Sequence, residues 1–379
     1  MNLGRSDIHA TASWTAAVLC RFRRALERAK APEDWRSPKP GGPLVGSWRV
    51  KPAPLEPSTI GRLFLRLGSN GMAVFTAFVL LPGCSSTQPV APVPAAVSQT
   101  RLQADNAAKL TGAGNWTAAA RAWQQTAEDY ALLNDRANEA IAWHNLAQAQ
   151  RELGQTASAR TRLEQAAALN LDSGRTNEWW RNQIVLLQIE RQDQENAAVE
   201  KRLALLTPLA ISLSAAELRG LFLNELGLWQ MRQSDMVHAE AAFRQAEQAF
   251  LKANHAPGLA AVLANRAQWA LAQGRPIEAL ALWRSALSRY ESLADARGIA
   301  LCLAGLGRAQ LAVGTALDQA ESHLRRAAEN YRRLNLKPER IATLKALLEC
   351  LDLEKKTVAA DPVREELKSL TASDPTKKE

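Results

Sequence analysis

Large apolar and small residues recur along the chain with a period of about 40 residues, a length that indicates a repeat architecture. Gly114, Gly154, Gly274 and Gly314 lie on one regular grid, whose other two points are Gln194 and Ser234. Nine positions after the grid points stand Trp123, Leu163, Leu203, Phe243 and Trp283, with Leu324 displaced by one position. Five positions after them stand Ala119, Ala159, Val199, Ala239 and Ala279, with Ala320 displaced by one.

The alternation of large and small positions predicts pairs of packed helices. A large side chain on one helix that faces small residues on its neighbour lets the two helices approach closely. The residue at each grid point ends the first helix of a unit, and turn-forming residues such as Asn134-Asp135 follow the second helix. We therefore predict six helix-turn-helix units between about residues 100 and 356. The third unit deviates, with Leu where Gly or Ala is expected and Pro208 late in its second helix.

These columns resemble the tetratricopeptide repeat family. The fourth unit carries Leu226-Gly227, Ala239, Phe243 and Ala246, and the fifth carries Gly274, Ala279, Trp283 and Ala286. The family's usual unit has about 34 residues, so the additional residues are expected to lengthen the helices. The resemblance implies an all-α fold: a right-handed α-solenoid of six repeats (residues 100–356) that ends in a capping helix over about 339–356. The charged residues 357–379 are expected to form a disordered tail.

The positive charge of the chain is concentrated before the repeats. Residues 1–83 contain 12 Lys or Arg and 5 Asp or Glu, whereas the remainder contains 35 and 33. The repeats are therefore nearly neutral, and no basic surface for nucleic acid is expected there. The four cysteines have no C-x-x-C spacing, so we expect no structural zinc. Cys302 and Cys350 are interpreted as buried free thiols, with a disulfide between them as the alternative.

A lipidation signal is predicted just before the repeats. Residues 72–81 form an uncharged apolar run that is too short to span a bilayer but suits a secretory signal. Arg62 and Arg66 precede this run, and Leu81-Pro82-Gly83-Cys84 after it resembles the bacterial lipobox. The resemblance implies a signal peptide over 61–83, cleavage between Gly83 and Cys84, and a lipid anchor on Cys84. A short buried helix that ends at Pro82-Gly83 is the alternative.

Residues 84–99 and 1–60 are expected to lack stable structure. The Pro- and Ser-rich segment 84–99 is interpreted as a flexible tether. Residues 31–61 show no periodic pattern, and residues 11–30 could form a short basic helix. Segment 1–60 is interpreted as a spurious extension upstream of the true start, or alternatively as part of a long leader.

No catalytic, cofactor or metal site is predicted. The five histidines are scattered, and Walker and G-x-S-x-G motifs are absent from the sequence. Gly305-Leu306-Gly307 falls in a repeat column, so its glycines are assigned to helix packing. Trp179-Trp180 is assigned partly to the core, with a partner-anchoring Trp as the alternative. We therefore expect a protein that is not an enzyme and has no cofactor.

Polar residues of the first helices are the candidate binding residues, because the inner, concave face of a solenoid usually binds its partner. The predicted set is His144, Gln148, Arg151, Arg181, Gln188, Arg191, Asn224, Arg232, Gln268 and Arg308. Ile184, Leu228 and Met231 lie on the same face. Such a surface could hold an extended peptide through amide groups and pair Arg with carboxylates. A merely solvated helix face is the alternative.

The function expected from these features is a lipid-anchored scaffold at the periplasmic face of the outer membrane. It would bind another envelope protein or peptide through the concave face, as an assembly factor or activator. The alternative is a cytoplasmic tetratricopeptide adaptor whose basic N-terminal arm is genuine.

Overall fold

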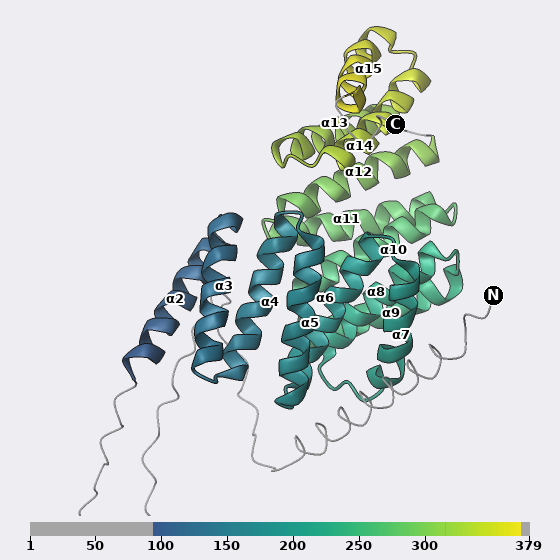
Figure 1. Ribbon diagram of the computed structural model, residues 1–379. Helices are drawn as coiled ribbons and strands as arrows, with labels where there is room; N and C mark the ends of the chain where they lie inside the picture. The colour runs from purple at the N-terminus through teal and green to yellow at the C-terminus, as the bar shows by residue number, and fades with distance from the viewer. Residues whose placement is uncertain (1–93, 315, 373–379) are drawn as a thin grey trace, which may run out of the picture. The chain divides into compact units, whose positions relative to one another are not determined.

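The computed structural model describes residues 94–314 and 316–372, and this part of the chain consists of fourteen helices without strands (Figure 1). The first helices of the pairs are α2 (Ala95–Gly112), α4 (Arg136–Glu152), α6 (Thr176–Gln192), α8 (Ala216–Arg232), α10 (Ala256–Ala272), α12 (Ala296–Val313) and α14 (Lys337–Leu353). The second helices are α3 (Trp116–Leu132), α5 (Thr156–Asp172), α7 (Asn196–Ala210), α9 (Met236–Ala253), α11 (Pro276–Ser292), α13 (Leu317–Arg333) and α15 (Thr357–Ala372).

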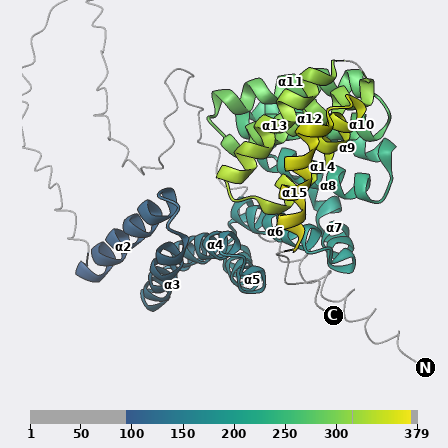
Figure 2. The ribbon, with the colours of Figure 1, turned by 90° about the horizontal axis from the view of Figure 1, so that it is seen from above.

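Most helices pack on the helices that precede and follow them in the chain, as Figures 1 and 2 show from two directions. First helices of successive pairs also touch one another from α6 through α14. This order of contacts is that of an α-helical repeat solenoid, so the predicted fold class is confirmed.

The turns occur twice within each repeat unit and are evenly spaced. Backbone φ is positive at the same point of every described turn except one, namely at Gly114, Asn134, Gly154, Gly174, Gln194, Ser234, Asn254, Gly274, Ala294, Gly314, Asn335 and Lys355. At Asn134 the turn closes with Asn134 N donating to Ala131 O and Asp135 N donating to Tyr130 O. These are the two bonds of a Schellman motif, which ends a helix on a left-handed residue. The exception lies between α7 and α8.

The one-position slip of the sixth unit lies in the turn between α12 and α13. Both Gly314 and Ala316 have positive φ there, and α13 begins one position later than the regular grid requires. The inserted residue is therefore accommodated in the turn, and the large and small positions of α13 keep their places in the core.

Small residues in the middle of the first helices make room for rings of the second helices. A Cβ atom added to Gly227 on α8 would lie 2.6 Å from Cε1 of Phe243 on α9. A Cβ atom on Gly305 of α12 would overlap the ring of Trp283 on α11. Gly305 and Gly307 are buried within α12, which confirms their assignment to helix packing.

The C-terminal segment differs from the prediction. Residues 357–372 form helix α15, so the expected disordered tail does not begin at residue 357, and α14 has a partner. Ala360 and Val363 are buried, and Leu367 packs partly against the same cluster as Leu347. These apolar residues were missed in the sequence because charged residues and Thr surround them. Through them α15 packs against α14, and the two helices form a seventh pair.

The N-terminal boundary also differs. The tether was expected to extend to residue 99, but α2 begins at Ala95, directly after Pro94. Proline disfavours the helical backbone conformation in the residue before it and is common at helix starts. Pro94 therefore marks the start of α2 better than the 40-residue spacing does. Gly83, Cys84, the predicted signal peptide and residues 1–60 lie outside the described residues.

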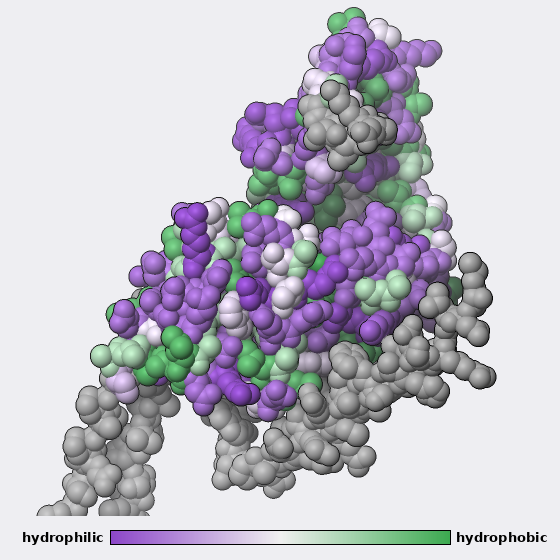
Figure 3. Space-filling model, in the orientation of Figure 1, coloured by the Kyte–Doolittle hydropathy of each residue, from purple (hydrophilic) through white to green (hydrophobic). Residues whose placement is uncertain are grey.

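Helix α12 is the one described helix that is long and apolar enough to cross a membrane by length and composition. More than half of its apolar window, 56%, is buried inside the fold, as in a core helix. On the face of the molecule that Figure 3 shows, hydrophilic residues predominate and hydrophobic residues form small groups.

Candidate functional site

The ten predicted binding residues all lie on first helices, from α4 to α12. We call the surface that they share the first-helix face. The structure brings six of them into contact with a neighbouring first helix. The surface therefore has to be divided into residues that bind neighbouring helices and residues that remain available.

Glu225 on α8 organises the largest group on the first-helix face. Its carboxylate accepts hydrogen bonds from Arg191 Nε at 2.9 Å and Gln188 Nε2 at 3.2 Å, both from α6. Only 6% of the Glu225 side chain is exposed. Arg232 of α8 returns the contact by donating from Nη1 to the backbone carbonyl of Arg191 at 3.0 Å. These three predicted residues therefore join α6 to α8.

Sequence reasoning missed Glu225 because it treated each helix face by itself. The sequence separation from Glu225 is 34 for Arg191 and 37 for Gln188. The separation of 37 is about one helical turn shorter than the 40-residue repeat, and the separation of 34 is about two turns shorter. Combining the repeat period with helical periodicity would therefore have indicated the contact.

Two further contacts continue this polar connection along the chain. Arg181 on α6 donates from Nη1 to Glu217 Oε1 on α8 at 3.1 Å. Asn265 on α10 donates from Nδ2 to Asn224 Oδ1 on α8 at 2.8 Å, and Asn224 is buried. Arg181 and Asn224 therefore position helices as well.

His144 joins α4 to α6. Its Nδ1 lies 2.7 Å from Oδ1 of the buried Asn182, and its Nε2 lies 2.9 Å from Nε2 of Gln148. The amide nitrogen of Gln148 can only donate, so Nε2 of His144 accepts there and Nδ1 donates to Asn182 in the neutral tautomer that fits both contacts. Burial lowers the pKa of His144, and the nearby Arg181 and Arg151 add to this effect, whereas Asn182 and Glu178 oppose it.

Three predicted residues remain available on the first-helix face. Gln268 on α10 and Arg308 on α12 are exposed, and Arg151 on α4 is half-buried. Among the described residues, none of these three side chains makes an ion pair or a side-chain hydrogen bond. Gln148 is also exposed, although it contacts His144. The surface thus offers two guanidinium groups and two amides on a scaffold held by polar bonds.

Trp179 and Trp180 both belong to the core. Their exposed fractions are 2% and 1%, and their rings meet edge to face at 5.6 Å. Trp180 makes a similar contact with Phe222 of α8 at 5.6 Å. The core assignment is confirmed, and neither ring is available as an exposed anchor.

Cys302 and Cys350 are free and buried, which confirms the first of the two interpretations. Burial raises the pKa of the Cys302 thiol to about 12 and that of Cys350 to about 11. Both thiols are therefore protonated at neutral pH and poorly nucleophilic.

A carboxylate cluster near the C-terminal end surrounds a lysine. Asp318, Glu321 and Glu354 lie close enough to hold an ion, but Lys356 Nζ contacts their oxygens at 2.9, 2.8 and 3.0 Å. The ammonium group already supplies the positive charge there, and these contacts fix the turn before α15 to α13.

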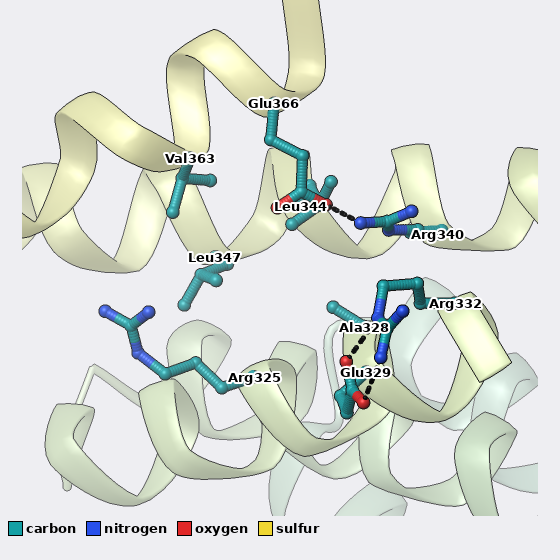
Figure 4. Close-up of a pocket in the computed structure, with 9 residues that line it drawn as sticks. All are labelled: Arg325, Ala328, Glu329, Arg332, Arg340, Leu344, Leu347, Val363 and Glu366. Atoms are coloured by element: carbon teal, nitrogen blue, oxygen red, sulfur yellow. Dashed lines mark hydrogen bonds and ion pairs between the residues drawn. The ribbon is translucent and has the colours of Figure 1, made fainter. Parts of the chain in front are cut away.

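A cavity of about 310 Å³ lies between α13, α14 and α15 (Figure 4). Its apolar lining is Ala328, Leu344, Leu347 and Val363. Arg340 pairs with Glu366 at one edge, and Glu329 pairs with Arg332 at 2.7 Å at another. The arginines lower the pKa of Glu329 to about 2. The Arg340–Glu366 pair links α14 to α15, whereas the Glu329–Arg332 pair lies within α13.

Comparisons with known proteins identify the fold. No protein family model matches the sequence, and no curated protein matches it. Among solved structures, the apo form of the quorum sensor NprR from B. thuringiensis has a TM-score of 0.58 and 13% identity, covering 73% of this chain and 77% of that one. BtubC (BKLC) from P. vanneervenii has a TM-score of 0.48 and 17% identity, covering 58% of this chain and 91% of that one.

The class of fold follows from the helix pairs together with the likeness to the NprR structure. The chain has the fold of a tetratricopeptide-type helical repeat protein, as the sequence columns predicted. A TPR repeat-containing protein from Cytophaga hutchinsonii was also found, at 14% identity, 72% coverage of this chain, 96% of that chain and a TM-score of 0.34. At these identities the likeness concerns the fold alone.

Proposed function

We propose that this protein is a lipid-anchored periplasmic scaffold that binds another envelope protein or peptide through its first-helix face. The observation that supports it most is the division of that face. Buried bonds such as Arg191–Glu225 hold α6 and α8 in a defined arrangement, while Arg151, Gln268 and Arg308 keep their donors available on α4, α10 and α12.

The chemistry of the available groups favours a peptide with backbone carbonyls and carboxylates exposed. Glutamine amides can bond to peptide groups, and guanidinium groups can take carboxylates with two bonds. A preorganised surface also loses less conformational entropy on binding than a mobile one. The proposed role is that of an assembly factor or activator rather than an enzyme.

The lipid anchor is tested separately from the binding face. Growth with labelled palmitate should label the wild-type protein, and the mature mass should begin at Cys84. A Cys84→Ser variant should lose the label and leave the outer-membrane fraction. If that variant fractionates and is processed like the wild type, the anchored scaffold is wrong, and a periplasmic reporter fused after residue 100 then tests the cytoplasmic alternative.

The binding face is tested by photocrosslinking in cells. A benzophenone amino acid at Gln268 should give a discrete crosslinked product, and the same group at Ser288, which is exposed on the second helix α11, should not. Adding Arg151→Ala and Arg308→Ala should reduce the Gln268 product at least fivefold. Equal products from both positions would contradict binding through the first-helix face.

A further inference from the structure

The third helix pair departs from the packing rule of the other pairs. At the two columns where first and second helices meet through small residues, α6 carries Leu187 and α7 carries Leu206. Both side chains are fully buried, with 1% and 0% exposure. Since the separation of packed helices depends on the side chains between them, α6 and α7 approach one another less closely than the helices of the three pairs that follow.

This separation leaves a groove between the second helices α5 and α7, with α6 as its floor. Two adjoining cavities of about 320 and 380 Å³ share Glu164, Arg202 and Leu205. The floor is formed by Trp179, Gln183 and Leu186 of α6. The wall along α5 extends from Arg160 to Asp172, which corresponds to about 18 Å at 1.5 Å per residue.

The orientation of the Arg202 side chain explains why it does not fill the groove. Its guanidinium turns toward α6, where Nε and Nη2 bind the Glu190 carboxylate at 2.7 and 2.6 Å and Nη1 binds Gln183. In the preceding groove, the corresponding Arg162 instead lies over the ring of Trp143, 4.5 Å from its centroid. Because α6 has Gln183 where α4 has Trp143, Arg202 finds no ring at that corresponding position.

The edges of the groove are acidic. Four carboxylates line it, namely Glu164, Asp172, Glu190 and Glu195, against the three cations Arg160, Lys201 and Arg202. Arg160 pairs with Asp193 at 3.3 Å and Glu195 at 2.9 Å, and Arg202 pairs with Glu190. The apolar part of the groove, from Ala167 and Leu171 to Leu205, therefore lies within a negatively charged rim.

We propose that the α5–α7 groove is a second docking surface, which binds a short amphipathic helix of a partner protein with an apolar stripe flanked by Lys and Arg. A groove of about 18 Å accommodates about twelve helical residues. Apolar side chains of that helix would enter beside Leu171 and Leu205, and its cations would meet Glu164 and the acidic edges. Such recognition through anchors at three- and four-residue spacing is a general way for helices to bind grooves.

The groove is tested with two synthetic 14-residue peptides and the purified full-length chain. Both peptides have Leu at positions i, i+3, i+4, i+7 and i+11, and the other positions are mainly Lys in one and mainly Glu in the other. Fluorescence anisotropy should show micromolar binding of the cationic peptide and at least tenfold weaker binding of the acidic one. Absence of binding, or equal binding of the two peptides, overturns the proposal.

Matched variants locate the binding. Ala168→Arg on α5 places a bulky cation at the groove and should raise the Kd of the cationic peptide at least tenfold. Ser288→Arg, at the corresponding exposed position of α11, should change it less than twofold. Glu164→Lys should raise the Kd at least fivefold. Similar effects of the two Arg variants would show that the peptide binds elsewhere, and circular dichroism checks that all variants are folded.

Discussion

Arg202 on α7 holds Glu190 on α6 through two hydrogen bonds, from Nε at 2.7 Å and from Nη2 at 2.6 Å. The Glu190 side chain is 5% exposed and that of Arg202 is 14% exposed. The two charges thus face each other across α6 and α7, which are less closely packed than the three helix pairs that follow. They hold α7 against α6 where large leucines keep the helices apart.

We predict that Arg202→Ala destabilises the protein by about 3 kcal/mol, because it leaves the Glu190 charge buried without a partner. The control is Arg162→Ala at the corresponding position of α5, where a cation–π contact of about 1 kcal/mol is lost. Urea unfolding followed by circular dichroism measures both. The double variant Arg202→Met with Glu190→Leu should recover most of the loss, and a double variant as unstable as Arg202→Ala would contradict this explanation.

We predict that Gly227→Ala destabilises the protein by about 1–3 kcal/mol, because the added methyl group forces the Phe243 ring to move within a packed core. Gly112→Ala is the control, since nothing lies within 4 Å of its added Cβ. That control should be neutral or slightly stabilising, as alanine favours helix over glycine. Equal urea midpoints for the two variants would show that α8 and α9 are not packed as described.

We predict that Ala294→Gly stabilises the protein by about 0.5–1 kcal/mol, because alanine has a φ of 53° in this turn and glycine adopts such a φ without strain. Gly274→Ala, in the equally open turn before α11, should destabilise by about 1 kcal/mol. Thermal melts monitored at 222 nm compare the two. Destabilisation by Ala294→Gly would contradict the left-handed turn.

We predict that the protein loses stability as the pH falls below about 6.5. Burial lowers the pKa of both His144 and His323 in the folded state. The unfolded chain then binds more protons than the folded one below the ordinary histidine pKa of about 6.5, so acid favours unfolding.

The measurement for this prediction is urea unfolding at pH 7 and pH 5.5. The wild type should lose more unfolding free energy between the two values than a variant with His144→Gln and His323→Gln. Proton NMR titration of the imidazoles should also place both pKa values below 6.5. The same pH dependence in both proteins would show that these histidines are not responsible.

The repeat columns contain enough information to predict the helices but little to predict their contacts. Gly227 opposite Phe243 and Gly305 opposite Trp283 were recognisable as packing positions, because large and small residues alternate at fixed spacing. The predicted binding residue Arg191, by contrast, proved to be held by Glu225 of the next first helix. Which polar residue remains available depends on its neighbour one repeat away.

The sequence by itself determined the period, the helix pairs, the place of the turns and the buried state of the thiols. These features depend on local periodicity, since the spacing of apolar residues sets the buried face of each helix. Only the tertiary structure decided that α15 pairs with α14, that Glu225 binds Arg191 and Gln188, and that Leu187 and Leu206 open a groove between α5 and α7. Each of these depends on distances between side chains of different helices, which no single helix pattern contains.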